Sequence, residues 1–183
     1  MNGFSDGQNL ASIPYMFEIP SCPSPGVDVG AGSRSLQAWE EARALWPNLQ
    51  HLGQVYPGFS LWYWGKVIPG VLRGSRRIFI EGRPQDPEGV AIAKREADEC
   101  KVCTLWVSTE SRGKGVGRRL LGEAIDWVGV KRPVFTVPQE RHDELRPLLR
   151  RFNFEKRAAL PSLYRPGVLE HIYNGEHLPS FNS

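Results

Sequence analysis

The sequence is poor in the residues and segments that several protein classes require. It has three cysteines in 183 residues, which argues against a disulfide framework. Cys100 and Cys103 form one C-x-x-C without the second pair that a zinc site needs, so no bound metal is expected. The apolar runs are far shorter than a membrane span, and no charged-then-apolar leader opens the chain. A cytoplasmic protein with no membrane association is the default expectation.

An excess of charge of one sign is also lacking. The 23 basic and 20 acidic residues leave a net charge of +3, which suits an anionic ligand but does not by itself argue for nucleic acid. Two basic clusters keep RNA contact open beside the simpler reading of a solvated helix face; they are Arg112, Lys114, Arg118 and Arg119, then Arg146, Arg150, Arg151, Lys156 and Arg157.

Length and composition fit one soluble domain. Hydrophobic residues make up 40% of the chain and charged residues 23%, which is ordinary for a globular protein. Residues 1–12 are polar and rich in glycine, so we expect a disordered N-terminus there. We expect a single domain over residues 13–175, followed by a C-terminal tail over residues 176–183.

The glycine-rich stretch Arg112–Gly117 is the most informative feature that is present. An apolar, β-prone run, Val102–Val107, precedes it, and an amphipathic helical pattern follows from Val116 to Val128. A strand that leads through a glycine-rich turn into a helix aims several backbone N–H groups at one point, and the helix N-terminus adds partial positive charge. This arrangement predicts a phosphate-binding loop, with a purely structural turn as the alternative.

Three phosphate-loop patterns compete for this stretch. The P-loop requires Lys and Ser/Thr after its second glycine, but Arg118 and Arg119 follow Gly117. The dinucleotide fingerprint requires a third small residue, but Arg118 or Leu120 stands at that place, depending on the pair of glycines counted. The pattern Gln/Arg-x-x-Gly-x-Gly/Ala is met by Arg112, Gly115 and Gly117. It resembles the pyrophosphate-binding motif of the GNAT superfamily of acyl-CoA N-acyltransferases.

The order of predicted elements also resembles the GNAT fold. We expect helices from Ser33 or Ser35 to Pro47, within 57–64, after the loop and over 139–152, and strands at 15–19, 77–81, 89–94, 100–107, 134–137, 157–160 and 169–173. The resemblance implies an α+β fold. Its central sheet would be mixed but mostly antiparallel, with six to seven strands, a V-shaped splay between the fourth and fifth strands, and about four flanking helices.

The same resemblance implies acetyl-CoA as the co-substrate. The fourth strand would pair with the pantetheine arm, chiefly through Leu105, Trp106 and Val107, and the pyrophosphate would bind the loop residues Arg112, Gly113, Lys114, Gly115, Val116, Gly117 and Arg118. The implied reaction is transfer of an acetyl group, within a ternary complex, to a primary amine of a small molecule or protein. The protein would act as a monomer or homodimer.

The catalytic side chains are less clearly marked. Many GNAT enzymes carry a tyrosine acid in the helix after the fifth strand, where this sequence has Leu149. Tyr164 is the nearest substitute, with a packing role as the alternative. Glu99 precedes the fourth strand and could reach a bound amine, with an ordinary exposed carboxylate in a turn as the alternative. Because Leu149 replaces the usual tyrosine, a non-catalytic acyl-CoA sensor stays open as an alternative function. An acetyltransferase toxin acting on aminoacyl-tRNA is a further alternative, suggested by the basic clusters.

Overall fold

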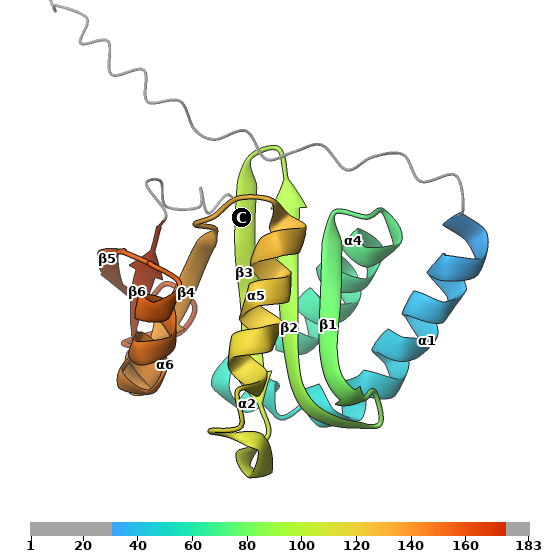
Figure 1. The fold of residues 1–183 in the computed structure, drawn as a ribbon, viewed down its shortest axis with the longest axis horizontal. Helices are drawn as coiled ribbons and strands as arrows, with labels where there is room; N and C mark the ends of the chain where they lie inside the picture. The colour runs from blue at the N-terminus through green and yellow to red at the C-terminus, as the bar shows by residue number, and fades with distance from the viewer. Residues whose placement is uncertain (1–30, 175–183) are drawn as a thin grey trace, which may run out of the picture.

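A six-stranded sheet organises residues 31–174, the part of the chain that the computed structural model describes (Figure 1). Its strand order is β1-β2-β3-β4-β6-β5, and every neighbouring pair is antiparallel except β3 and β4. The strands are β1 (Arg76–Arg83), β2 (Asp86–Glu96), β3 (Glu99–Val107), β4 (Val134–Pro138), β5 (Lys156–Pro161) and β6 (Leu169–Tyr173). The predicted α+β class with a mixed, mostly antiparallel sheet is confirmed.

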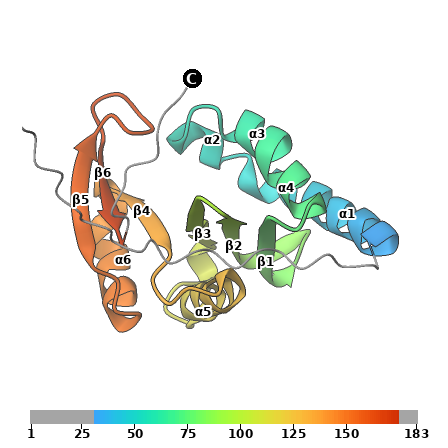
Figure 2. The same cartoon turned by 90° about the horizontal axis from the view of Figure 1, so that it is seen from above.

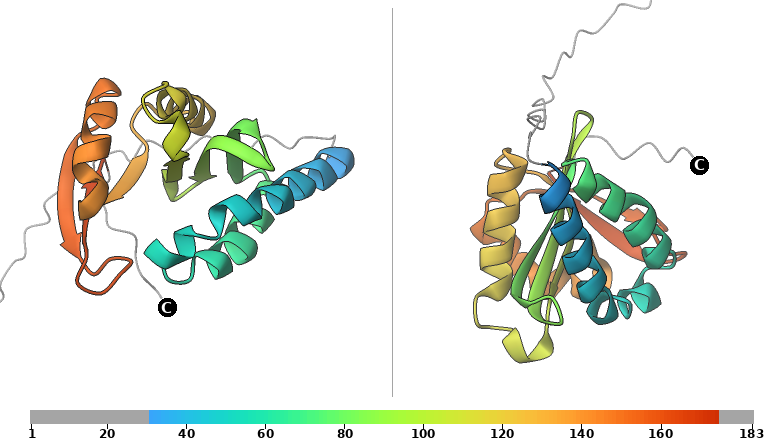
Figure 3. Two further views of the ribbon diagram at one scale, coloured as in Figure 1. Left: turned by 90° about the horizontal axis from the view of Figure 1, so that it is seen from below. Right: turned by 90° about the vertical axis from the view of Figure 1, so that its right-hand side faces the viewer.

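Helices cover both faces of this sheet (Figures 2 and 3). One face carries α1 (Ala31–Leu49), α2 (Leu52–Val55), α3 (Phe59–Trp62), the π-helical turn η1 (Tyr63–Val67) and α4 (Ile68–Leu72). The other face carries α5 (Val116–Val128) and α6 (Gln139–Arg151), and a short 3-10 turn, η2 (Thr109–Ser111), precedes α5. Each face therefore has its own apolar core, because a sheet covered on both sides must bury residues of both orientations.

The parallel pair β3–β4 separates soon after it forms. Only Lys101 pairs with Val134, and Val102 with Phe135, among the register partners of these two strands. On the other side of β3, Ala93 pairs with Val102 and Ile92 with Thr104, so Cys103 is an extra, bulged residue. A bulge bends its strand and increases the local twist. Figure 2 shows the result, with β1–β3 and β4–β6 as two arms of a V.

The splay thus lies between the two strands for which it was predicted. They are named β3 and β4 here because the first predicted strand, at residues 15–19, lies outside the described residues, as do the segments 1–12 and 176–183. The helix predicted within residues 57–64 is longer than predicted and continues as helical turns to Leu72. Pro69 is tolerated because it stands in the first turn of α4, where its missing N–H is not required.

Cysteine and membrane-related features complete the description. Cys100 is disulfide-bonded, which the argument from cysteine number did not anticipate, and Cys103 is a free thiol. Within residues 31–174, no helix is long and apolar enough to cross a membrane. The same part of the chain contains no group of three or more histidine, cysteine or acidic side chains arranged to hold a metal ion.

Candidate functional site: the splay between β3 and β4

The glycine-rich loop turns the chain from β3 into α5 through two left-handed residues. Gly113 has φ 75° and Gly115 has φ 82°, a region that side chains with a Cβ rarely adopt. Gly115 is also the N-cap of α5 and contributes no side-chain cap; its carbonyl accepts from the Arg118 and Arg119 amides. The amides at the start of a helix have no partner within the helix. The loop therefore offers backbone donors and the positive end of a 13-residue helix to an anion.

Cationic side chains around the loop have two different roles. Arg112, Lys114 and Arg118 are exposed, so their charges are available to a ligand. Arg119 is instead held in place: its Nε lies 2.7 Å from Glu81 Oε1 on β1, and its Nη1 donates to the Lys114 carbonyl at 3.3 Å. Arg119 therefore braces the loop against the sheet. No sequence pattern predicts this role, because it depends on Glu81, which is distant along the chain.

The predicted pantetheine contacts lie along the part of β3 that has left β4. Leu105 is buried in the core under α5, and Trp106 is half-buried on the opposite face, where its ring lies 5.7 Å from that of His51. Val107 packs beside the start of α5, since a Cβ atom at Gly117 would lie 3.4 Å from Val107 Cγ2. Beyond Val102, β4 provides no register partner for β3. The backbone along this edge can pair with an extended, amide-containing ligand.

Tyr164 lies where the two strands begin to separate. Lys101 Nζ, on β3, donates to Tyr164 Oη at 2.9 Å, and Thr136 Oγ1, on β4, lies 3.5 Å from the same oxygen. The tyrosine comes from the loop between β5 and β6 and is 36% exposed. One hydroxyl therefore contacts both halves of the sheet at the base of the splay while remaining open to the cleft side.

Lys101 is a buried cation that holds this hydroxyl. It is 8% exposed, and although burial opposes its charge, the neighbouring Tyr164, Cys103 and Glu99 raise the pKa of Lys101 above its ordinary value. The amine is therefore protonated and acts as a donor at neutral pH. Glu99, the second predicted catalytic residue, lies 3.1 Å from Lys94 Nζ and 4.0 Å from Lys101 Nζ. It is close to the base of the splay, but its carboxylate is paired with these lysines.

A second polar group lines the other arm of the V. Arg165 pairs with Glu140 at the start of α6, and its guanidinium lies 5.4 Å from the Tyr56 ring centroid. The Tyr56 ring in turn meets that of Tyr164 edge-on at 6.2 Å. Behind them lies Glu170 on β6, which is completely buried. The sequence analysis did not single out Tyr56, Glu140 or Glu170, because only the fold brings these three segments together.

The remaining predicted features are structural. Leu149, at the place of the usual tyrosine, is fully buried in the core under α5 and α6. Among the clustered aromatics, Phe59 and Tyr63 are buried, and the Tyr63 hydroxyl donates to the Ala42 carbonyl at 2.8 Å. This bond fastens η1 to α1. The aromatic segment therefore serves mainly as core, although Trp62 stays half-buried with the Arg76 guanidinium 5.9 Å from its ring.

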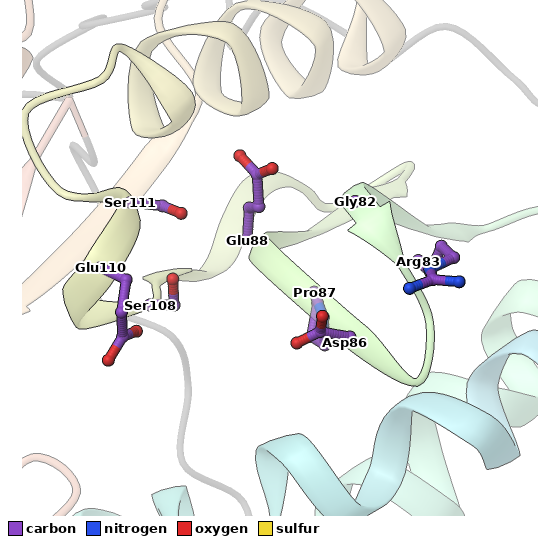
Figure 4. Close-up of a pocket in the computed structure, with 8 residues that line it drawn as sticks. All are labelled: Gly82, Arg83, Asp86, Pro87, Glu88, Ser108, Glu110 and Ser111. Atoms are coloured by element: carbon purple, nitrogen blue, oxygen red, sulfur yellow. The ribbon is translucent and has the colours of Figure 1, made fainter.

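An open pocket of about 500 Å³ lies beside the loop, between the β1–β2 turn and the end of β3 (Figure 4). Its lining residues are Gly82, Arg83, Asp86, Pro87, Glu88, Ser108, Glu110 and Ser111. Three of these are carboxylates and one is an arginine, so the pocket repels an anion rather than attracting one. The exposed cations and the helix N-terminus belong to the adjacent Arg112–Arg118 segment and not to this pocket.

A splayed parallel pair with a glycine-rich loop at its open end defines the class of acyl-CoA-dependent acyltransferases. The family model described as Acetyltransferase (GNAT) family matches residues 31–154, and the chain belongs to that family. The resemblance drawn from the Arg112–Gly117 motif is thereby confirmed. No curated protein gives a significant match to the chain.

Solved structures share the fold at low sequence identity. A protein from Desulfovibrio desulfuricans, assigned to the GNAT acetyltransferases, is 18% identical with a TM-score of 0.57, over 73% of this chain and 90% of its own. The ribosomal-protein-S18-alanine N-acetyltransferase of Escherichia coli is 20% identical with a TM-score of 0.46, over 57% and 74%. The yncA protein of Salmonella typhimurium, solved with acetyl-CoA, is 20% identical with a TM-score of 0.46, over 60% and 70%. At these identities the likeness concerns the fold alone.

Proposed function

We propose that the protein is an N-acetyltransferase that transfers the acetyl group of acetyl-CoA to a primary amine. Membership of the GNAT acetyltransferase family supports an acyltransferase. The observation that carries the finer proposal is the position of Tyr164, whose hydroxyl contacts Lys101 on β3 and Thr136 on β4 at the base of the splay. A proton donor at that point lies at the base of the splay, and the glycine-rich loop that we propose to bind phosphate follows the end of β3.

The loop and the unpaired part of β3 would orient acetyl-CoA in one direction. Its pyrophosphate would bind the amides and cations of the loop, from Arg112 to Arg118, and its pantetheine arm would run along Leu105–Val107, where β3 has unpaired backbone. The thioester then reaches the Lys101–Tyr164 pair. The surroundings fit the group, because the loop presents exposed cations and an uncapped helix N-terminus.

The chemistry asks two things of the protein once the substrates are bound. The departing thiolate needs a proton, and we assign its donation to the Tyr164 hydroxyl, with the Lys101 ammonium stabilising the phenolate that forms. The oxyanion needs N–H donors, and the unpaired β3 backbone near the bulged Cys103 can supply them. Glu99 is the alternative titrating group, although its pairing with Lys94 at 3.1 Å reduces its availability.

The acceptor would enter from the side of the sheet that carries α1–α4 and the β5–β6 loop. Tyr56 and Tyr164 form an aromatic edge there, and rings of this kind attract cationic amines. A small molecule and an exposed amine of a protein both meet these requirements.

Release of free thiol from acetyl-CoA tests the proposal. The purified protein would be mixed with acetyl-CoA and, in turn, a polyamine, a lysine-containing peptide and a peptide with a free N-terminus, with a reaction lacking acceptor as the background. Thiol release that depends on one amine, with one acetyl group added to that amine, is the expected result. Tight binding of acetyl-CoA with no release on any amine would instead establish a non-catalytic binder.

A further inference from the structure

Glu170 is an acidic side chain in a position where a charge is costly. It is the second residue of β6, which lies between β4 and β5, and its side chain is 0% exposed. Neither carboxyl oxygen has a hydrogen-bond partner within the described residues. A buried carboxylate without a partner is strongly disfavoured, so such groups are kept where a ligand or a proton satisfies them. The packing of this strand alone gives no reason for an acid.

Strand alternation places Glu170 on the acceptor side of the sheet. His171 and Tyr173 face α6, where His171 contacts Gln139 and Tyr173 contacts His142. Glu170 therefore points to the opposite face, together with its cross-strand neighbours on β4. Thr136, on that same face of β4, lies 3.5 Å from the Tyr164 hydroxyl. The buried carboxyl and the proposed acid thus lie on the same face of the sheet.

The charged groups around Glu170 do not neutralise it fully. Arg165 Nη2 lies 3.9 Å from Glu170 Oε1, but the same nitrogen is hydrogen-bonded to Glu140 on α6. Lys101 on β3 is a more distant cation, already donating to Tyr164. Tyr56, from the segment between α2 and α3, also lies near Glu170, but it carries no positive charge that could neutralise the carboxylate.

Burial and the nearby Glu140 carboxylate raise the pKa of Glu170 to about 7, against the opposing effect of Arg165 and Lys101. A carboxyl with such a pKa exchanges a proton readily at neutral pH, which an ordinary glutamate does not. Perturbed acids in clefts of this kind are candidates for proton transfer. The geometry and the charge balance therefore indicate the same role.

We propose that Glu170 accepts the proton that the acceptor's ammonium must lose before it attacks, through water that reaches the carboxyl past the half-buried Tyr56 and Arg165. This inference rests on the proposed function and names the base that the proposed function leaves open. Because the carboxyl is buried, it acts through this water and does not touch the amine. Glu99 has the opposite properties, since it is half-exposed and paired with lysines.

The proton and electron balance of the step is complete. The ammonium gives one proton to the Glu170 carboxylate, and the freed lone pair forms a bond to the acetyl carbon as the carbon–sulfur bond breaks. Tyr164 gives its proton to the departing thiolate and regains one from the newly formed, still protonated amide nitrogen. Glu170 later releases its proton to solvent, so each turnover yields one acetylated amine, one thiol and one proton.

The substitution Glu170→Gln tests this role through pH. With the amine that gives the fastest thiol release, kcat should fall about 10²-fold at pH 8, the usual size of a lost general base. At pH 5.5 only about one wild-type carboxyl in thirty is ionised at a pKa near 7, so the ratio of wild type to variant should shrink to about threefold. The ratio cancels the titration of the amine itself. A ratio that stays constant from pH 5.5 to 8 would overturn the proposal.

Glu140→Gln is the matched control, because it removes the other carboxylate of Arg165 by the same chemical change. Because the Glu140 carboxylate raises the pKa of Glu170, Glu170 should stay ionised to lower pH in this variant, which should therefore keep more activity than the wild type at pH 5.5 and match it at pH 8. If both variants lost activity in the same pH-dependent way, displacement of Arg165 would explain the effect and Glu170 would not be the proton acceptor. Turnover by the wild type with an unchanged Glu170→Gln profile removes this inference alone, whereas no turnover on any amine removes the proposed function as well.

The pH dependence of the folding stability tests the raised pKa of Glu170 without an acceptor amine. The pKa of Glu170 is raised in the folded protein from an ordinary 4.5 to about 7, so the folded state binds an additional proton between these values. The wild type should therefore lose stability as pH rises through this window, and Glu170→Gln should not. The Tm of the variant should exceed that of the wild type increasingly from pH 4.5 to 7.5. A difference in Tm that does not change with pH would show that Glu170 ionises normally, which overturns the proposal.

Discussion

At the scale of single residues, Tyr164 joins two strands that the fold otherwise separates. Its hydroxyl accepts from Lys101 at 2.9 Å and lies 3.5 Å from Thr136 Oγ1. The Lys101 cation is buried and paired, so it favours the phenolate that would remain after Tyr164 gives up its proton. The same lysine makes the contact directional, because an ammonium can only donate.

Tyr164→Phe removes the hydroxyl and leaves the ring in contact with Tyr56. We expect kcat to fall about 10²-fold, because the thiolate loses its proton donor, while the Kd for acetyl-CoA stays within about twofold. Steady-state thiol release and calorimetry measure the two quantities. Tyr173→Phe makes the same change on the opposite face, where the hydroxyl lies 2.9 Å from His142 Nε2, and should leave kcat unaltered. Wild-type turnover by Tyr164→Phe would return this tyrosine to a packing role.

Sequence reasoning reached some of these residues and missed others for physical reasons. Tyr164 can be predicted from the sequence, because Leu149 stands at the place of the usual tyrosine acid and another hydroxyl must then supply the proton. Glu170 was missed because it sits in the pattern Leu169–Tyr173, where one acid in a short strand normally marks a solvent-facing side. In the structure β6 is an interior strand with both neighbours in place, so the acid is buried. Strand position in the sheet is a property of topology, which local alternation does not encode.

At the scale of elements, the β3–loop–α5 unit is the best-specified part of the chain. The helix begins at Val116 directly after the left-handed Gly115, and it ends at Val128 before Gly129, which has φ 79°. Glycines at both ends and apolar positions at helical spacing made these bounds predictable. The loop and its helix also act together in the proposed function, since the helix start supplies the amides and the loop supplies the cations.

Gly117→Glu places a carboxylate at the start of α5 beside Val107. We expect binding of acetyl-CoA to become undetectable, because the new charge occupies and repels the pyrophosphate position. An acid in the first turn of a helix is compatible with the helix dipole, so the fold should survive, and Tm checks this. Gly65→Glu adds the same side chain at an exposed position of η1 with open space around it and should bind normally. Unchanged affinity in Gly117→Glu would show that the loop is only a turn.

The helical segment on the other face was harder to predict. Phe59–Leu72 contains four large aromatics, two glycines and a proline, none of which favours a long helix. Tertiary contacts compensate, because Tyr63 bonds to the Ala42 carbonyl and its ring packs against that of Trp46 at 5.1 Å. The π-helical turn η1 lies in this segment. Local propensity therefore underestimated an element that exists through its packing on α1.

At the scale of the whole molecule, the splay exists because β3 and β4 pair over a short stretch only, in a sheet whose two faces are covered by helices. Two register pairs join β3 to β4, after which the bulge at Cys103 and the separate cores direct the strands apart. The residue patterns of β3 and β4 do not predict this separation, because it depends on how α1–α4 and α5–α6 cover the two faces of the sheet. The family resemblance implied it, and the register of the strands then showed it.

In the proposed function, the open end of this splay is a coenzyme A site. Calorimetric titration of the purified wild-type protein with acetyl-CoA, and separately with ATP and NAD, tests that claim most directly. The account predicts one acetyl-CoA bound per chain with micromolar affinity, and far weaker binding of the two nucleotides, because only acetyl-CoA carries an amide arm that can pair with Leu105–Val107 beyond the pyrophosphate. Absence of acetyl-CoA binding, or equal binding of ATP, would contradict it.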